Sequence, residues 1–240
     1  MNILNLPYMK RFAALLIAAF AINAFALDHI WDMHYTFGPD SKPAPKFGAG
    51  VGLRSDFGSN VLFPINILGS VSKDFDIGAK MDVYTYDKMD HSQISMDVGG
   101  RYRFTPGKFL EIDGYFGLNR NTGSAIVVTY AFEQFIAKSF SNFYELRSGF
   151  LDGVTGKDGY AKLAAGMTPT LYFGKTFRIM TEIIASGSIG YLKDDFMVDI
   201  IPKLELALGS ARVRLDFDIG VMQDDNNDQK TIGLYVMTAL

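Results

Sequence analysis

The feature that most constrains this chain is an alternation of apolar and polar residues that begins near Lys46 and continues to the C-terminal residue. Successive side chains of a β-strand point to opposite faces, so a repeat of two residues predicts strands with one apolar and one polar face. The clearest segment alternates charged with large apolar residues: Arg212-Val213-Arg214-Leu215-Asp216-Phe217-Asp218-Ile219. The chain therefore predicts an all-β structure with one long apolar surface.

Twelve segments of this kind follow one another along the chain. They cover residues 46–54, 60–72, 75–86, 94–104, 110–119, 125–137, 142–150, 160–173, 177–183, 196–208, 212–221 and 232–240. Most have the length that crosses a bilayer when a strand is tilted, and an even number is typical of bacterial single-chain barrels. We expect a closed antiparallel up-and-down transmembrane β-barrel of 12 strands. The alternative is 10 strands, because 125–137 hardly alternates and 142–150 is short.

The connections between these segments alternate in length. Tight turns follow the even-numbered segments, and longer polar loops follow most of the odd-numbered ones, which is the pattern of outer-membrane barrels with short periplasmic turns. We expect both ends of the chain that forms the barrel to lie on the periplasmic, short-turn side. Aromatic residues beside the short turns predict an interfacial girdle: Phe75, Phe104, Phe109, Phe140, Phe143, Phe173 and Phe177.

Three prolines fall inside the expected strands, at Pro64, Pro169 and Pro202. Proline lacks the N–H that a paired strand donates to its neighbour. We therefore expect these three positions to lie at β-bulges.

The first 26 residues read as a secretory signal peptide. Lys10 and Arg11 precede an apolar run from Phe12 to Ile22, and Ala24-Phe25-Ala26 has the form of a cleavage site. A transmembrane anchor is the alternative, but the apolar run is short for a bilayer core of about 30 Å. Residues 27–45 then form an N-terminal segment and linker, and residues 46–240 form the barrel.

No later segment has the continuous apolar stretch of a membrane helix, so a membrane location requires a barrel. A secreted or periplasmic β-sandwich would also alternate, but so many amphipathic strands imply one extended apolar exterior. The chain resembles bacterial outer-membrane β-barrel (porin-like) proteins in its succession of strands and in a final strand that ends in phase at Leu240, where those proteins usually have phenylalanine. The resemblance implies an outer-membrane location, with membrane lipid and the barrel-insertion machinery as partners.

The polar face of the expected barrel is heavily charged and would line the lumen. Its basic residues are Lys80, Arg101, Arg103, Arg147, Lys162, Arg178, Lys203, Arg212 and Arg214. Its acidic residues are Asp82, Asp97, Glu111, Asp113, Glu145, Glu182, Asp199, Glu205, Asp216 and Asp218. Because the two signs are balanced, no strong ion filter is indicated. The charges either line a passive pore for small polar solutes or pair across strands and close the lumen, giving a structural or surface-interaction barrel.

Other functional classes find little support. The net charge of −3 gives no basis for nucleic-acid binding, and the absence of cysteine excludes disulfides and cysteine-ligated metals. We expect no cofactor. A membrane-embedded hydrolase is a remote alternative, based on His91 between Asp90 and Ser92 on an expected outer loop, but adjacent residues of an extended loop point apart.

Two further clusters have simpler explanations than metal binding. Asp224, Asn226 and Asp228 match the opening of a calcium loop, but Gln229 stands where glycine is needed and no glutamate closes the loop, so a solvated hairpin tip is the better interpretation. His29 and His34, with Trp31, are explained as well by a tethered N-terminal segment or small plug.

Overall fold

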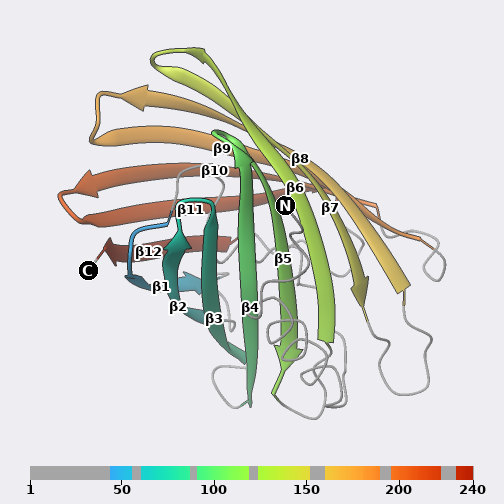
Figure 1. Ribbon diagram of the computed structural model, residues 1–240. Helices are drawn as coiled ribbons and strands as arrows, with labels where there is room; N and C mark the ends of the chain where they lie inside the picture. Colours follow the sequence, from blue (N-terminus) through green and yellow to red (C-terminus); the bar gives the residue numbers. More distant parts are fainter. Residues whose placement is uncertain are drawn as a thin grey trace.

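The chain forms a closed β-barrel of twelve antiparallel strands within the residues that the computed structural model describes (Figure 1). These residues are 44–55, 61–86, 91–118, 124–151, 160–189, 196–222 and 231–239. The strands are β1 (Gly48–Ser55), β2 (Val61–Ser72), β3 (Phe75–Tyr86), β4 (His91–Thr105), β5 (Lys108–Gly117), β6 (Ser124–Ala137), β7 (Phe140–Leu151), β8 (Tyr160–Phe173), β9 (Phe177–Ile189), β10 (Met197–Leu208), β11 (Ala211–Met222) and β12 (Thr231–Ala239).

Each strand pairs with its neighbours in sequence, and β1 pairs with β12 to close the barrel, with Gly48 opposite Ala239. The predicted twelve-strand up-and-down barrel is confirmed, and the ten-strand alternative is wrong. Strand β7 is not short: Phe140 and Ser141 extend it beyond the predicted start, because they pair with the end of β6. Among the described residues, no α-helix has the length and hydropathy needed to cross a bilayer.

The three strand prolines do not lie at bulges, so that expectation is wrong. The bulges interrupt other positions, between Ser70 and Ser72 for example. Each proline instead keeps its place in a ladder on one side, as Pro202 does opposite Thr181 of β9. On the other side, the pairing of β10 with β11 skips Pro202 and resumes at Lys203 without a shift. A missing N–H therefore costs a local gap in one ladder and leaves the register intact.

One end of the barrel carries the short turns. Gly107, Gly174 and Gly209 adopt positive φ in three of these turns, which glycine tolerates best. The backbone N–H of Ala239 donates to the carbonyl oxygen of Ser210 in the β10–β11 turn, so β12 finishes beside the short turns as expected (Figure 1). His91, which we expected on an outer loop, instead begins β4 opposite Tyr86.

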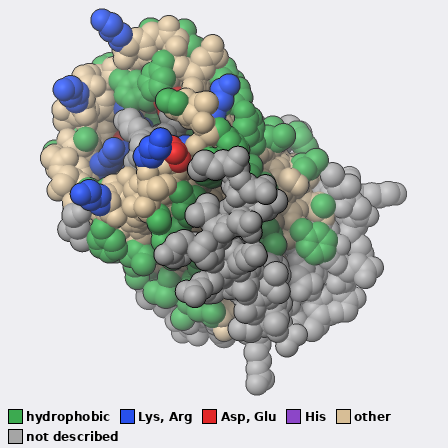
Figure 2. Space-filling model, viewed as in Figure 1, with side chains coloured by type: hydrophobic (Ala, Val, Ile, Leu, Met, Phe, Trp, Pro, Cys, Tyr) green, Lys and Arg blue, Asp and Glu red, His purple; other side chains and the backbone are tan. Residues whose placement is uncertain are grey.

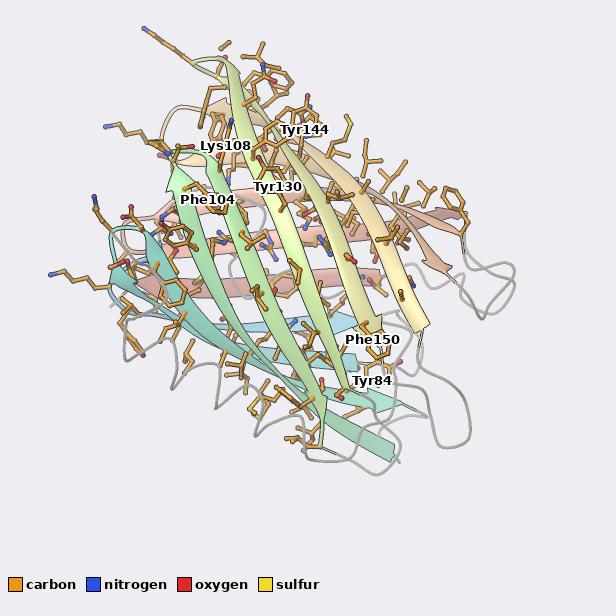
Figure 3. All side chains as sticks on the ribbon, turned by 45° about the vertical axis from the view of Figure 1, so that its right-hand side comes forward. Tyr84, Phe104, Lys108, Tyr130, Tyr144 and Phe150 are labelled. Carbon is orange, nitrogen blue, oxygen red and sulfur yellow. The ribbon has the colours of Figure 1, made fainter. Side chains whose placement is uncertain are left out.

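The outside of the barrel is apolar. Large side chains such as Ile67, Leu146 and Phe173 are exposed, as lipid-facing residues of a transmembrane barrel are. Rings gather near the short turns, where Tyr130, Phe132 and Tyr144 form a contiguous group. Figure 3 shows Phe104, Tyr130 and Tyr144 at this end, and Phe150 toward the opposite end.

Two residues expected in the aromatic girdle lie inside the barrel instead. Phe109 and Phe143 are buried against each other, with ring centroids 5.8 Å apart. Their position follows from the period of two, because Phe109 is in phase with Glu111 and Phe143 is in phase with Glu145.

The short-turn rim is basic. Exposed lysines stand in or beside successive turns: Lys73, Lys108, Lys138 and Lys175. Figure 2 shows Lys and Arg side chains gathered at this end above the hydrophobic flank. Lys108 lies next to the aromatic girdle (Figure 3), at the level where long basic side chains extend from the apolar band toward water.

Candidate functional site in the barrel interior

The interior of the barrel holds the charged residues. Seventeen of the nineteen charged side chains singled out from the sequence are buried: Lys80, Asp82, Asp97, Arg101, Arg103, Glu111, Asp113, Glu145, Arg147, Lys162, Arg178, Glu182, Asp199, Lys203, Glu205, Asp216 and Asp218. The other two, Arg212 and Arg214, are partly exposed. Burial of this many charges requires partners, and the structure supplies most of them.

One ion-pair network crosses β7, β9, β10 and β11. Arg147 contacts Glu145 at 2.8 Å and Glu182 at 3.6 Å. Glu182 also pairs with Lys203. Lys203 lies 4.0 Å from Asp216, which pairs with Arg214 at 2.9 Å. We call these residues the β7–β11 network: Glu145, Arg147, Glu182, Lys203, Asp216 and Arg214. It contains three acidic and three basic groups, so its charges balance.

Small residues on β8 allow this network to pass from β7 to β9. The inward positions of β8 beside Arg147 and Glu145 are Ala164 and Gly166. A Cβ atom at Gly166 would lie 2.5 Å from Oε1 of Glu145, so the carboxylate occupies the space above the glycine. The side chain of Arg147 can therefore reach Glu182 across β8 at the place where that strand presents only Ala164 and Gly166.

A second set of pairs lies near the short-turn mouth. Arg103 pairs with Asp76, and both guanidinium nitrogens of its fork contact that carboxylate. Arg178 donates two hydrogen bonds to Glu205, at 2.9 and 2.8 Å. Arg212 approaches the same Glu205 at 3.7 Å. Paired donors matching both carboxylate oxygens fix geometry as well as charge.

Two interior partners were not among the expected lumen residues. Asp76 is fully buried and binds Arg103, and Arg54 pairs with Asp218. The alternation of β3 already placed Asp76 on the inner face, because it lies an even number of positions before Lys80 and Asp82. Arg54 lies near the end of β1, whose other inward positions are Gly48, Gly50 and Gly52. Because these glycines give no alternation of polar and apolar side chains, the sequence did not indicate that Arg54 faces inward.

An apolar patch interrupts the charged interior beside β6. Phe109 and Phe143 pack with Ala131 of β6, and the Arg101 guanidinium lies 4.0 Å from the Phe109 ring centroid. Arg101 also donates to Oε2 of Glu111 at 2.9 and 2.7 Å. The patch explains why the β6 sequence hardly alternates, since small apolar residues face inward there and large apolar residues face outward.

The wall formed by β3, β4 and β5 is less completely paired. Lys80 contacts Asp82 at 3.1 Å. Asp97 lies opposite Lys80 in the β3–β4 register and opposite Tyr115 in the β4–β5 register. Asp113 lies over Gly99, and its Oδ1 occupies the place that a Cβ atom would take at this glycine. Within the described residues, neither Asp97 nor Asp113 has an ion-pair partner within 4.0 Å, in contrast to the acids of the β7–β11 network.

The sector around β12 and β1 is lined by glycine. The ring of Tyr235 lies against Gly52 and Gly233, where a Cβ would approach it to 2.5 and 2.7 Å. The Arg214 guanidinium is 4.8 Å from the same ring centroid. Tyr235 is thus held flat on the wall, with its ring continuing the β7–β11 network toward β1.

No group of three or more histidine, cysteine or acidic residues able to hold a metal ion occurs in the described part of the chain. The signal peptide, the histidines His29 and His34 and the aspartate cluster from Asp224 to Asp228 lie outside those residues.

The fold is that of outer-membrane porins. The solved structure of a KdgM porin matches with a TM-score of 0.58 at 10% sequence identity, covering 80% of this chain and 99% of the porin. A KdgM porin in complex with disordered oligogalacturonate matches with a TM-score of 0.56 at 11% identity, with the same coverage. A bacterial polysaccharide outer membrane secretin matches with a TM-score of 0.50 at 4% identity, covering 81% of this chain and 98% of the secretin. No protein-family model matches the chain, and no curated protein does.

Proposed function

We propose that this protein is a passive outer-membrane channel for small polar solutes. The likeness to porins covers the fold alone, and the interior of this barrel provides the support for transport. An inward face made of charged and hydroxyl groups offers water and polar solutes the hydrogen bonds that they lose on leaving bulk solvent. The apolar exterior supplies the matching lipid-facing surface.

The proposal rests mainly on how the interior ion pairs are oriented relative to the barrel wall. Each pair described above joins residues on one strand, on neighbouring strands or on strands separated by one other. Arg147 reaches Glu182 over β8, and Arg54 reaches Asp218 over β12, which are the longest of these steps. The pairs therefore run around the wall rather than across the barrel, and the glycines beneath Glu145 and Tyr235 let these side chains lie flat.

A barrel with a closed lumen is the second candidate. Lys203, Glu182 and Glu111 are completely buried and Arg101 is nearly so, and interior charges held this tightly also stabilise a structural barrel. Twelve strands lie between the eight that side chains just fill and the sixteen or more that leave an aqueous channel, so strand number favours neither candidate.

Single-channel recording separates the two candidates. Folded protein, identified by its heat-modifiable mobility on gels, is reconstituted into planar bilayers in potassium chloride. Discrete conductance steps support the channel, and repeated insertion of folded protein without any steps contradicts it. Protein denatured before reconstitution is the control for leakage caused by insertion alone.

The cellular setting follows from the same proposal. We place the mature barrel in the outer membrane, exported by a cleaved signal peptide at residues 1–26 and inserted by the barrel-insertion machinery. Fractionation tests the location: recovery in the outer membrane supports it, and recovery only as soluble periplasmic protein contradicts it. N-terminal sequencing of the recovered protein tests the cleavage, which should leave Leu27 first.

A further inference from the structure

The charge of the interior is balanced overall, but not in every sector of the wall. The inward middle of β3, β4 and β5 holds two basic groups, Lys80 and Arg101. Four carboxylates share this sector: Asp82, Asp97, Glu111 and Asp113. Lys80 pairs with Asp82, and Arg101 pairs with Glu111. Two carboxylates therefore remain in excess, whereas the β7–β11 network has equal numbers of both signs.

The excess carboxylates are Asp97 and Asp113, on neighbouring strands. Each is buried at 8% exposure, and Oδ1 of each has no hydrogen-bond partner among the described residues. Asp113 lies over Gly99, the next inward residue after Asp97 on β4, so the two acids flank one glycine. Negative charge at this density, facing a lumen with low-dielectric walls, attracts cations.

Tyr115 gives an independent indication that a ligand completes this wall. Its side chain is 2% exposed, and its hydroxyl lies near Ser95 of β4 without forming a hydrogen bond of normal geometry. It stands directly opposite Asp97 in the β4–β5 register, in phase with Asp113 on its own strand. A buried phenol oxygen and two buried carboxylate oxygens without partners are all groups whose lone pairs a cation can satisfy.

We infer that Asp97, Asp113 and Tyr115 form a cation-attracting patch that makes the lumen selective for small monovalent cations over anions. This inference rests on the proposed channel function. The patch is not a fixed metal centre, because no group of three or more acidic or histidine residues in the described chain is arranged to hold a metal ion. Its ligand is a passing cation that keeps most of its water, which suits a site of passage rather than of storage.

The test is the reversal potential of the reconstituted protein in a tenfold potassium chloride gradient. Wild-type protein should pass potassium in preference to chloride. The variant D97N/D113N keeps the shape of both side chains, and its potassium-to-chloride permeability ratio should fall by about fivefold, the scale of one close charge in a water-like dielectric. The variant D224N/D225N removes the same total charge outside the described strands and should keep the wild-type ratio.

The outcomes separate this inference from the channel itself. A conducting wild-type protein without cation preference, or a D97N/D113N variant with an unchanged ratio, overturns the cation patch and leaves the channel standing. Folded protein that never conducts contradicts the proposed channel function, and the inferred cation selectivity is then contradicted as well. If D97N/D113N does not fold, the wild-type reversal potential alone still decides, and the variant Y115F should lower the ratio by a smaller amount.

Discussion

The Oε1 atom of Glu145 lies 2.5 Å from the position that a Cβ atom would take at Gly166. The carboxylate thus occupies the place of a side chain on the neighbouring strand. Any larger residue at position 166 must displace Glu145, which contacts Arg147, and Arg147 bridges β8 to reach Glu182. One glycine therefore controls whether the β7–β11 network is continuous.

We expect G166V to lower the stability of the folded barrel by about 1–3 kcal/mol, the usual cost of overpacking, with G166A at the lower end. Urea titration in lipid vesicles, followed by heat-modifiable gel mobility, measures the change. The matched control is A165V, because Ala165 is exposed on the outer face and added bulk there meets lipid. Equal stability of G166V and A165V would contradict the role assigned to Gly166.

The pair of Arg101 with Glu111 provides a second prediction. Arg101 and Glu111 are almost completely buried, and the guanidinium also lies over the Phe109 ring. We expect R101M to destabilise the barrel by about 3–5 kcal/mol, because it leaves the buried Glu111 without its partner. The double variant R101M/E111Q should recover much of that loss.

The control for this pair is the exposed contact of Lys73 with Asp74 at 3.7 Å in the β2–β3 turn. D74N should change stability by less than about 0.5 kcal/mol, since exposed ion pairs contribute little. Urea titration of the three variants gives the comparison. A loss in R101M no larger than that in D74N would show that the interior around Arg101 is well solvated.

The alternation of side chains made most of the fold predictable from the sequence. The period of two identified all twelve strands and placed the charged residues of β11 on one face. The same period also indicates that Phe109 faces inward, because it is in phase with Glu111. Its nearness to a short turn had instead suggested a place in the aromatic girdle. For β6 the signal was weak because an apolar interior patch leaves no contrast between the two faces.

Ion-pair partners were beyond the reach of the sequence. A contact such as Arg147 with Glu182 depends on the register of two ladders and on the small side chains of β8, which no local pattern reveals. The excess of carboxylates around Asp97 was hidden for the same reason. Acidic and basic residues are nearly equal in number along the chain, and only the folded barrel shows which of them are neighbours.

The turn glycines give a third prediction, based on backbone conformation. Gly174 adopts φ of 68° in the β8–β9 turn, and nothing lies within 4 Å of its Cβ position. Strain alone therefore opposes a side chain there, and G174A should cost roughly 1–2 kcal/mol of stability. G174N should cost less, because asparagine tolerates this conformation better. Urea titration of both variants tests the order, and a G174A variant as stable as wild type would contradict it.

The apolar exterior gives a prediction that depends on depth in the membrane. Ile112 is exposed in the middle of β5, whereas Leu208 is exposed at the end of β10 beside a short turn. A lysine in the bilayer midplane costs about 2–4 kcal/mol, and the cost falls to about 0–1 kcal/mol near the interface, where the side chain reaches water. I112K should therefore fold into lipid vesicles with much lower stability than L208K, as measured by urea titration of the vesicle-inserted protein. Similar losses for both would mean that the barrel does not cross the bilayer at the depth that its short-turn aromatic girdle indicates. The same pair assayed in detergent micelles, which lack a fixed hydrocarbon thickness, should differ less, and this comparison separates the effect of membrane depth from that of local packing.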